Sequence, residues 1–292
     1  MDEKTKKTSH EQGFFAEFVK EYRKNKGAVI GLIILVIVLI TGIVSIFVID
    51  YDTQIAKINI QQALQAPSAA HFFGTDQYGR DIFCRIMYGT HYSLLIGICA
   101  VMVSVSIGSV LGVIAGYFGG IVETVIMRVM DVISPIPSVL LAICIASAFG
   151  QSLVSLMLAV GIVTVPAFAR TARASVMMVR DEEYIDAARS QGASHFHIIT
   201  QHIIPNSLAP IIVQATMRVA SAIIVASSLS FLGLGIPAPK PEWGGMLSEG
   251  RNFIGTNAYM TIFPGLAIMI TVLSINLIGD GIRDAMDPRL KR

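Results

Sequence analysis

Residues 184–206 read YIDAARSQGASHFHIITQHIIPN and form a polar, helix-forming segment between long apolar runs. Asp186, Ala187 and Ala188 come first, and Gly192 follows them. Alanine is the best helix former, whereas glycine permits a tight turn or the close approach of another backbone. A membrane protein has no solvation reason to keep such a segment in one piece unless something outside the bilayer contacts it. The segment is therefore interpreted as a docking element.

The second half of this segment predicts another short helix. Ser194 can cap it, and its face would carry Phe196, Ile199 and Ile203, with Pro205 ending it. A short helix with small side chains beside a glycine suits docking into a groove on a partner. The alternative interpretation is an ordinary amphipathic connector that lies on the membrane surface.

Composition places the chain among membrane proteins. Of its 292 residues 53% are hydrophobic and only 14% are charged, whereas soluble proteins have about 25% charged residues. The net charge of +2 gives no basis for a nucleic-acid partner. Cys84, Cys99 and Cys144 have no paired spacing, so neither a disulfide framework nor a metal site is expected.

Long apolar runs predict the number of membrane crossings. A helix rises about 1.5 Å per residue, so about 20 apolar residues cross a hydrocarbon core of about 30 Å. The predicted fold class is an all-α polytopic membrane protein with six transmembrane helices, near 28–49, 92–118, 125–149, 153–168, 210–232 and 259–278. Pro135 and Pro137 predict a kink in the third of these helices.

The distribution of Lys and Arg predicts the orientation of the chain. One face would carry 16 of these residues and the other five, with Arg218 left out because it falls inside a helix. The richer face is cytoplasmic by the positive-inside rule. The expected domains are a cytoplasmic tail 1–27, a first transmembrane helix 28–49, an extracytoplasmic segment 50–91, a transmembrane core 92–279 with a cytoplasmic loop 170–207, and a cytoplasmic tail 280–292.

A ridge of small residues predicts close helix packing. Ser104, Gly108, Gly112 and Gly116 recur every four residues and share one helix face. Such a ridge lets two backbones approach within a membrane.

Arg218 is the main electrostatic anomaly within an expected span. It lies about two turns past Pro210, and a central Arg costs roughly 2.5–3.5 kcal/mol on insertion scales. It either lines the translocation path, where it would contact a carboxylate, or it snorkels to the headgroups or forms an internal pair. Arg128 and Asp131 are spaced to form a local pair on one helix.

Several separated motifs carry a resemblance to a known family. The order of residues in 184–206 resembles the coupling loop of binding-protein-dependent ABC importers. Four further groups of residues are similar to the dipeptide/oligopeptide branch of their permeases: FGTD with GRD at 73–81, Met127 and Arg128 with Asp131, LSFLGLG at 229–235, and WGGML at 243–247. Together the motifs cover most of residues 71–290. The chain resembles the C-type permeases of peptide, and sometimes nickel, importers.

Three positions depart from the family pattern. Asp186 stands where glutamate is usual, and His202 stands where isoleucine is usual. Ala226 occupies the place of an acidic residue that commonly precedes the LSFLGLG run, so any role of that acid is in doubt here.

The resemblance implies an assembly and a mechanism. One N-terminal helix would precede a five-helix core like that of methionine- and peptide-importer permeases. The coupling residues would be Asp186, Ala187, Ala188, Gly192 and Pro205. The implied partners are a homologous B-type permease subunit, two ATP-binding subunits, an extracytoplasmic substrate-binding protein and a peptide substrate, all at the bilayer of a prokaryotic cell.

The chain is not expected to be an enzyme or to hold a cofactor. None of its nine lysines follows a glycine, so it has no phosphate-binding loop. The alternatives are a nickel or other small-solute importer of the same branch, and a self-contained secondary transporter. A secondary transporter would predict buried acidic residues in several helices and an inverted repeat. An intramembrane serine protease would need a Gly-x-Ser-Gly turn, and the sequence contains none.

Overall fold

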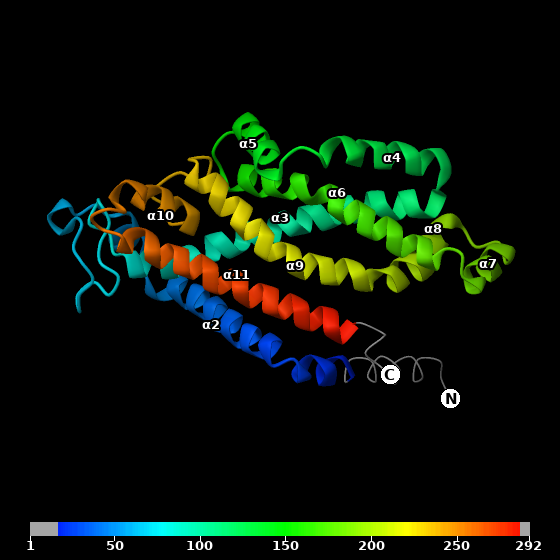
Figure 1. Cartoon of the computed structure of the whole chain (residues 1–292), viewed down its shortest axis with the longest axis horizontal. Helices are drawn as coiled ribbons and strands as arrows, with labels where there is room; N and C mark the ends of the chain where they lie inside the picture. Colours follow the sequence, from blue (N-terminus) through cyan, green and yellow to red (C-terminus); the bar gives the residue numbers. More distant parts are fainter. Residues whose placement is uncertain (1–16, 287–292) are drawn as a thin grey trace.

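The computed structural model describes residues 17–286, which form an elongated helical bundle (Figure 1). Five helical runs are long and apolar enough to cross a membrane. Their main helices are α2 (Lys26–Val48), α3 (Ile82–Phe118), α6 (Leu153–Val179), α9 (Ile204–Phe231) and α11 (Tyr259–Met286). The chain is therefore a multi-pass membrane protein, and the predicted all-α class is confirmed.

The sixth expected span is a broken one. α4 (Gly120–Ile133) and α5 (Ser138–Phe149) meet at a bend of 92°, and six spans result only if this pair counts as one. Pro135 and Pro137 lie at the break, as the sequence predicts. Proline disfavours the helical conformation in the residue before it, so two prolines in three residues separate the helices.

Four helices extend well beyond their expected ends. α3 begins at Ile82 rather than at 92, α6 continues past 168 to Val179, α9 begins at Ile204 rather than at 210, and α11 continues past 278 to Met286. The segment between α2 and α3 is accordingly shorter than the expected 50–91, and the loop after α6 begins later than 170. The sequence boundaries follow charge-free windows, but a helix continues through a charge when that charge has a partner.

Two charged residues in the extended part of α6 form ion pairs with another helix. Arg170 donates to Asp131 at 3.0 Å, and Arg173 donates through Nε to Glu123 at 2.7 Å. Both pairs join α6 to α4. The predicted pairing of Asp131 with Arg128 is replaced by this contact between helices, because Arg170 approaches from the neighbouring element.

The ridge of small residues joins α3 to α6, as the sequence predicts. A Cβ on Gly108 would lie 2.7 Å from the carbonyl oxygen of Val165, and one on Gly116 would lie 2.9 Å from that of Arg173. Ser104 donates to the carbonyl of Gly161 at 2.7 Å. Only small residues fit this contact, which makes α3 and α6 one rigid unit.

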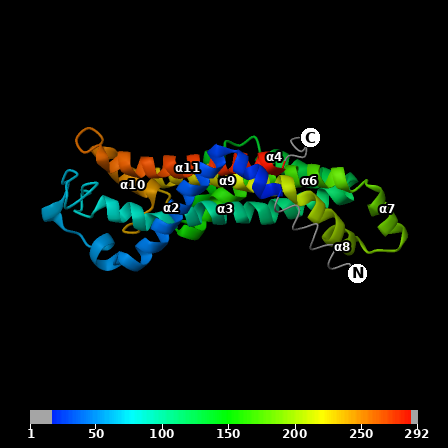
Figure 2. The same cartoon turned by 90° about the horizontal axis from the view of Figure 1, so that it is seen from below.

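Two caps of different character lie at opposite ends of the bundle (Figures 1 and 2). We name them after the orientation that the sequence predicts. The outer cap contains residues 49–81 and α10 (Trp243–Gly250). The inner cap contains α7 (Glu183–Ser190) and α8 (His195–Ile198). α2 and α11 pack side by side along one edge, where Gly31 allows the backbone of α2 to approach Ser274.

Candidate functional site

The polar segment forms α7, which presents small and charged side chains to solvent. Asp186 and Ala187 are exposed, whereas Ile185 is completely buried. Asp186 accepts a hydrogen bond from Arg189 at 3.1 Å. One face of this two-turn helix is thus attached to the bundle, and the other face is open for contact.

The attachment of the inner cap is apolar. Ile185, Ile198 and Ile203 are completely buried, and they pack in one cluster with Val113 and Tyr117 of α3 and Val176 of α6. Burying such side chains contributes about 1.5–3 kcal/mol each. A force applied to α7 is therefore transmitted to the α3–α6 unit.

Polar contacts reinforce the same attachment. The hydroxyl of Tyr117 lies 2.8 Å from Nδ1 of His195. Arg180 donates to the carbonyl of Gly116 at 2.8 Å, which satisfies one of the last carbonyls of α3. Arg180 precedes α7 in the chain and His195 follows it, so these two contacts hold both ends of the α7 segment to the end of α3.

Gly192 ends α7 in a left-handed conformation. Its φ is +81°, and its amide donates to the carbonyl of Arg189 at 3.0 Å. A Cβ built on Gly192 would meet no atom within 4 Å. Glycine is needed here for the backbone conformation, and any larger side chain would project into open space beside α7.

Two expectations for the second helix are wrong in detail. The expected common face of Phe196, Ile199 and Ile203 is divided, because Phe196 is 77% exposed whereas Ile203 is completely buried, as is Ile198. Pro205 ends no helix; it lies in the first turn of α9. A π-helical turn, Ile199–Ile203, joins α8 to α9, so the helical run is continuous from His195 to Phe231. Proline is tolerated there because the π-helical turn directly before it changes the helical hydrogen-bond pattern.

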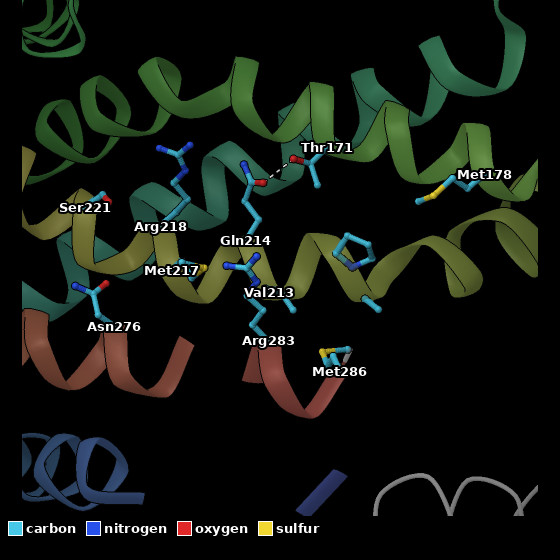
Figure 3. Close-up of a pocket in the computed structure, with 12 residues that line it drawn as sticks. Thr171, Met178, Val213, Gln214, Met217, Arg218, Ser221, Asn276, Arg283 and Met286 are labelled. Carbon is cyan, nitrogen blue, oxygen red and sulfur yellow. Dashed lines mark hydrogen bonds between the residues drawn. The ribbon is translucent and has the colours of Figure 1, made fainter. Parts of the chain in front are cut away.

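A chamber of about 770 Å³ opens between α6, α9 and α11 (Figure 3). Its polar lining comes from Thr171 of α6, Gln214, Arg218 and Ser221 of α9, and Asn276 and Arg283 of α11. Thr171 donates to the side-chain oxygen of Gln214 at 2.5 Å. Its two charged lining residues are both arginines, so the chamber offers positive charge and hydrogen-bond donors.

Arg218 lies deeper than the sequence predicts. α9 begins at Ile204, so Arg218 is about 21 Å along the helix and near its centre. Figure 3 shows its side chain pointing from α9 toward α6. Within residues 17–286, Arg218 has neither an ion-pair partner nor a hydrogen-bond partner. The function of Arg218 stays a prediction. Its position near the centre of α9 makes it unfavourable for the guanidinium to reach the lipid headgroups.

Arg283 is a lining residue that the sequence reading missed. It was assigned to the tail 280–292, whereas it lies on α11 and points toward α9 (Figure 3). Asn276 and Arg283 are spaced by seven residues, which places them on one helix face. That spacing is the signal that could have identified them as a polar stripe.

The outer cap contains a buried network of charges. Asp76 accepts hydrogen bonds from Arg80 at 2.6 Å and from Arg85. Glu249 of α10 accepts from the same two arginines at 2.9 and 2.8 Å. The Arg80 and Arg85 side chains are 3% and 1% exposed. The FGTD and GRD motifs therefore fasten the outer segment to α10.

The second outer motif is buried beside this network. Trp243 donates through Nε1 to the carbonyl of Ile86 at 3.0 Å. Glu242 caps α10 by accepting from the amides of Gly244 and Gly245, both at 2.8 Å. Burial nevertheless raises the pKa of the Glu242 carboxyl above its ordinary value. The FGTD, GRD and WGGML stretches thus lie together at this end of the bundle, joined to each other and to α3.

Comparison with known protein families gives two matches along the chain. Residues 108–292 match the family described as binding-protein-dependent transport system inner membrane component. Residues 13–67 match the N-terminal TM domain of oligopeptide transport permease C. The first match includes the inner cap, the chamber and α10.

Curated relatives are similar over nearly the whole chain. A dipeptide transport system permease protein of Alkalihalophilus pseudofirmus is 47% identical over 275 residues, which cover 94% of this chain and 90% of that protein. A glutathione transport system permease protein of Pectobacterium atrosepticum is 42% identical, with coverage of 94% and 91%. A probable D,D-dipeptide transport system permease protein of Escherichia coli is 43% identical, with coverage of 88% and 86%.

A solved structure has a similar fold. A chain of the MetNI methionine ABC transporter aligns with a TM-score of 0.57 at 17% identity. The alignment covers 70% of this chain and 96% of that one. The likeness concerns the arrangement of helices.

Proposed function

The chain belongs to the family of binding-protein-dependent transport system inner membrane components, and on that premise we propose that it is the C-type permease subunit of an ATP-driven peptide importer. The observation that carries the proposal is the similarity, over about nine-tenths of both chains, to a dipeptide transport permease. The substrate class is therefore di- or oligopeptides. The chain forms one half of the translocation path, and a homologous B-type subunit forms the other half.

The inner cap is the contact with the ATPase subunits. An exposed two-turn helix enters a cleft of an ATP-binding subunit. It contains Asp186, Ala187 and Ala188, and Gly192 follows its end. Pro205 begins α9 behind this contact and so links the docked segment to a chamber-lining helix. Because the buried isoleucines fasten the cap to α3 and α6, closure of the ATPases moves this unit as a rigid body.

ATP hydrolysis occurs in the partner subunits. The chain has no phosphate-binding loop of its own, so its purified form has no ATPase activity. An extracytoplasmic binding protein delivers the peptide to the outer cap. Both termini and the inner cap face the cytoplasm, in agreement with the distribution of Lys and Arg.

The chamber is part of the path, and Arg218 contacts the carboxylate of the passing peptide. A guanidinium without a carboxylate partner at the centre of a spanning helix faces either water or a cargo of opposite charge. The polar neighbours Gln214 and Asn276 offer hydrogen bonds without adding negative charge. The chamber therefore favours transient contact with an anionic group, which allows release.

Co-purification from native membranes tests the assembly, and reconstitution tests the substrate. We expect a second permease, an ATP-binding subunit and a binding protein to accompany the chain. The assembly in liposomes should hydrolyse ATP faster with a dipeptide-loaded binding protein than with the empty one. Stimulation by Ni²⁺ and not by peptides would replace the peptide assignment with the metal one. ATP hydrolysis by the chain alone would contradict its assignment as a permease.

Cysteine labelling tests the orientation. In a cysteine-free background, Gln61→Cys and Lys240→Cys should react with a membrane-impermeant reagent in intact cells, because Gln61 is exposed on the outer cap and Lys240 is exposed just before α10. Ser190→Cys, exposed on the inner cap, should react only after lysis. Reaction of Ser190→Cys in intact cells would reverse the orientation.

A further inference from the structure

An apolar groove lies where the first spanning helix begins. The helical segment 17–24 precedes α2 and forms one wall through Phe18 and Val19. Leu32 of α2 and Ile282 of α11 contribute to the other walls. The groove has a volume of about 520 Å³, within the range of about 300–1,000 Å³ that is usual for small-molecule sites.

Specific contacts hold the groove open. The Tyr22 ring lies against the backbone of Gly281, where an added Cβ would come within 2.9 Å of it. The Tyr22 hydroxyl donates to the carbonyl of Ala28 at 3.0 Å. Asn25 caps α2 by accepting from the amide of Ala28 at 3.1 Å, and it donates to Asp284 at 2.9 Å. The turn between segment 17–24 and α2 is therefore fixed, and the groove is a built feature of the fold.

The charge beside the groove is positive. Arg23 is its one charged lining residue, it is exposed, and it has no carboxylate partner within residues 17–286. Lys24 is engaged by Glu21 at 2.6 Å. Lys20 and Lys26 are exposed nearby. An apolar groove with an unpaired guanidinium at its edge requires a ligand with both an apolar chain and a negative charge.

The position of the groove identifies that ligand. Segment 17–24 is amphipathic and lies directly before an uncharged run, so the groove lies at the boundary between water and hydrocarbon. We propose that it binds an anionic glycerophospholipid, with an acyl chain along Val19, Leu32 and Ile282 and the phosphate at Arg23. A free phosphate supplies the charge but leaves the apolar walls uncovered.

Native mass spectrometry of the full chain with its co-purifying subunits tests the headgroup contact. The probes are mixed micelles that contain synthetic phosphatidylglycerol and phosphatidylcholine. A juxtamembrane cation strengthens the binding of anionic lipid about five-fold, so Arg23→Gln should lower retained phosphatidylglycerol about five-fold. Lys20→Gln is the matched control, because it removes one charge from the same segment outside the groove. Equal losses in the two variants, or no loss in Arg23→Gln, would overturn the proposal.

A second pair of variants tests the contact with the acyl chain without changing the charge of the protein. Leu32 is 43% exposed and lines the groove, whereas Leu39 of the same helix is 38% exposed and lies outside it. Leu32→Trp should fill the groove and lower the retention of phosphatidylglycerol several-fold, while Leu39→Trp should leave retention unchanged. Unchanged retention in Leu32→Trp, with normal assembly, would place the lipid elsewhere and overturn the proposal. Retention of inorganic phosphate in place of lipid would do the same.

Discussion

Arg85 and Arg218 are the same residue type in two opposite environments. Arg85 is 1% exposed and is held by Asp76 and Glu249 in the outer cap. Arg218 lies in the middle of α9, lines an open chamber and has no partner within the described residues. A charge held by carboxylates fixes a structure, whereas a charge without a carboxylate partner remains available to a passing ligand.

The two caps differ in the same way. The outer cap joins distant segments through buried, directional ion pairs, so it keeps its shape only when every partner is present. The inner cap is attached by buried isoleucines and presents an exposed helix. Apolar packing is non-directional, and only two polar contacts to the end of α3, from Arg180 and His195, are described beside it within residues 17–286.

Loss of the shared acid should have the largest effect. Asp76→Asn leaves Arg80 and Arg85 buried with Glu249 as their remaining carboxylate, and it should lower stability by about 3–5 kcal/mol. Thermal unfolding of the purified protein measures the change. Asp52→Asn, at an exposed position of the same outer segment, is the control and should leave the melting temperature unchanged. A stable Asp76→Asn protein would show that the network does not hold the outer cap.

A bulky residue on the inner cap should separate transport from folding. Gly192→Trp should reduce ATPase association at least ten-fold, because the side chain projects into the docking space. Gly150→Trp is a matched control: Gly150 also has a positive φ, +77°, and open space at its Cβ, but it lies between α5 and α6. Pull-down of the ATPase subunit measures both variants. Equal binding by Gly192→Trp and the wild type would favour the surface-connector interpretation.

Neutralising Arg218 should change the selectivity of peptide uptake by a smaller factor than the ten-fold loss expected for Gly192→Trp. Arg218→Gln should lower the uptake of a dipeptide several-fold more than the uptake of its C-terminal amide, because only the free peptide has a carboxylate for the guanidinium. Arg251→Gln, at an exposed position of the outer end, is the control. If Arg218→Gln lowers the uptake of both peptides equally, Arg218 supports packing or assembly and does not contact the carboxylate.

The smallest expected effect is a pH dependence of the outer cap. Burial raises the folded-state pKa of Glu242 above its ordinary value of 4.5. The folded protein then binds the proton more tightly than the unfolded chain, so this group's contribution to stability falls as pH rises from about 4.5 through the raised pKa. Glu242→Gln should reduce the difference in melting temperature between acidic and neutral pH. An unchanged difference would mean that Glu242 does not titrate with unfolding.

The sequence predicts the helices better than their ends. Apolar runs identify the spans because each run must satisfy its backbone within the bilayer. The charged residues Arg85 and Arg170 lead to wrong boundaries, because a partner in another element decides whether a charge ends a span. The acids that pair with Arg85 and Arg170 lie in other elements, and no local pattern reveals such long-range pairs.

The candidate site was predictable to a similar degree. The order of Asp186, Ala187 and Gly192 predicted an exposed docking helix with a turn, because propensity and backbone conformation are local properties. The burial of Ile198 instead of Phe196 depends on where the end of α3 lies, and that is a tertiary property. Arg218 was recognisable as an anomaly, whereas its chamber depends on the relative positions of α6, α9 and α11.

ATP-dependent uptake by reconstituted Ala187→Arg tests most directly whether α7 drives transport. Ala187 is exposed on α7, so the substitution adds length and charge to the exposed face of this helix without disturbing the buried cluster of Ile185, Ile198 and Ile203. The measurement compares accumulation of a labelled dipeptide in liposomes that contain the complete importer with wild-type or variant chain. We predict that the variant assembles with its permease partner but imports at least ten-fold more slowly, with loss of peptide-stimulated ATP hydrolysis. Import at the wild-type rate would contradict a docking role for this helix.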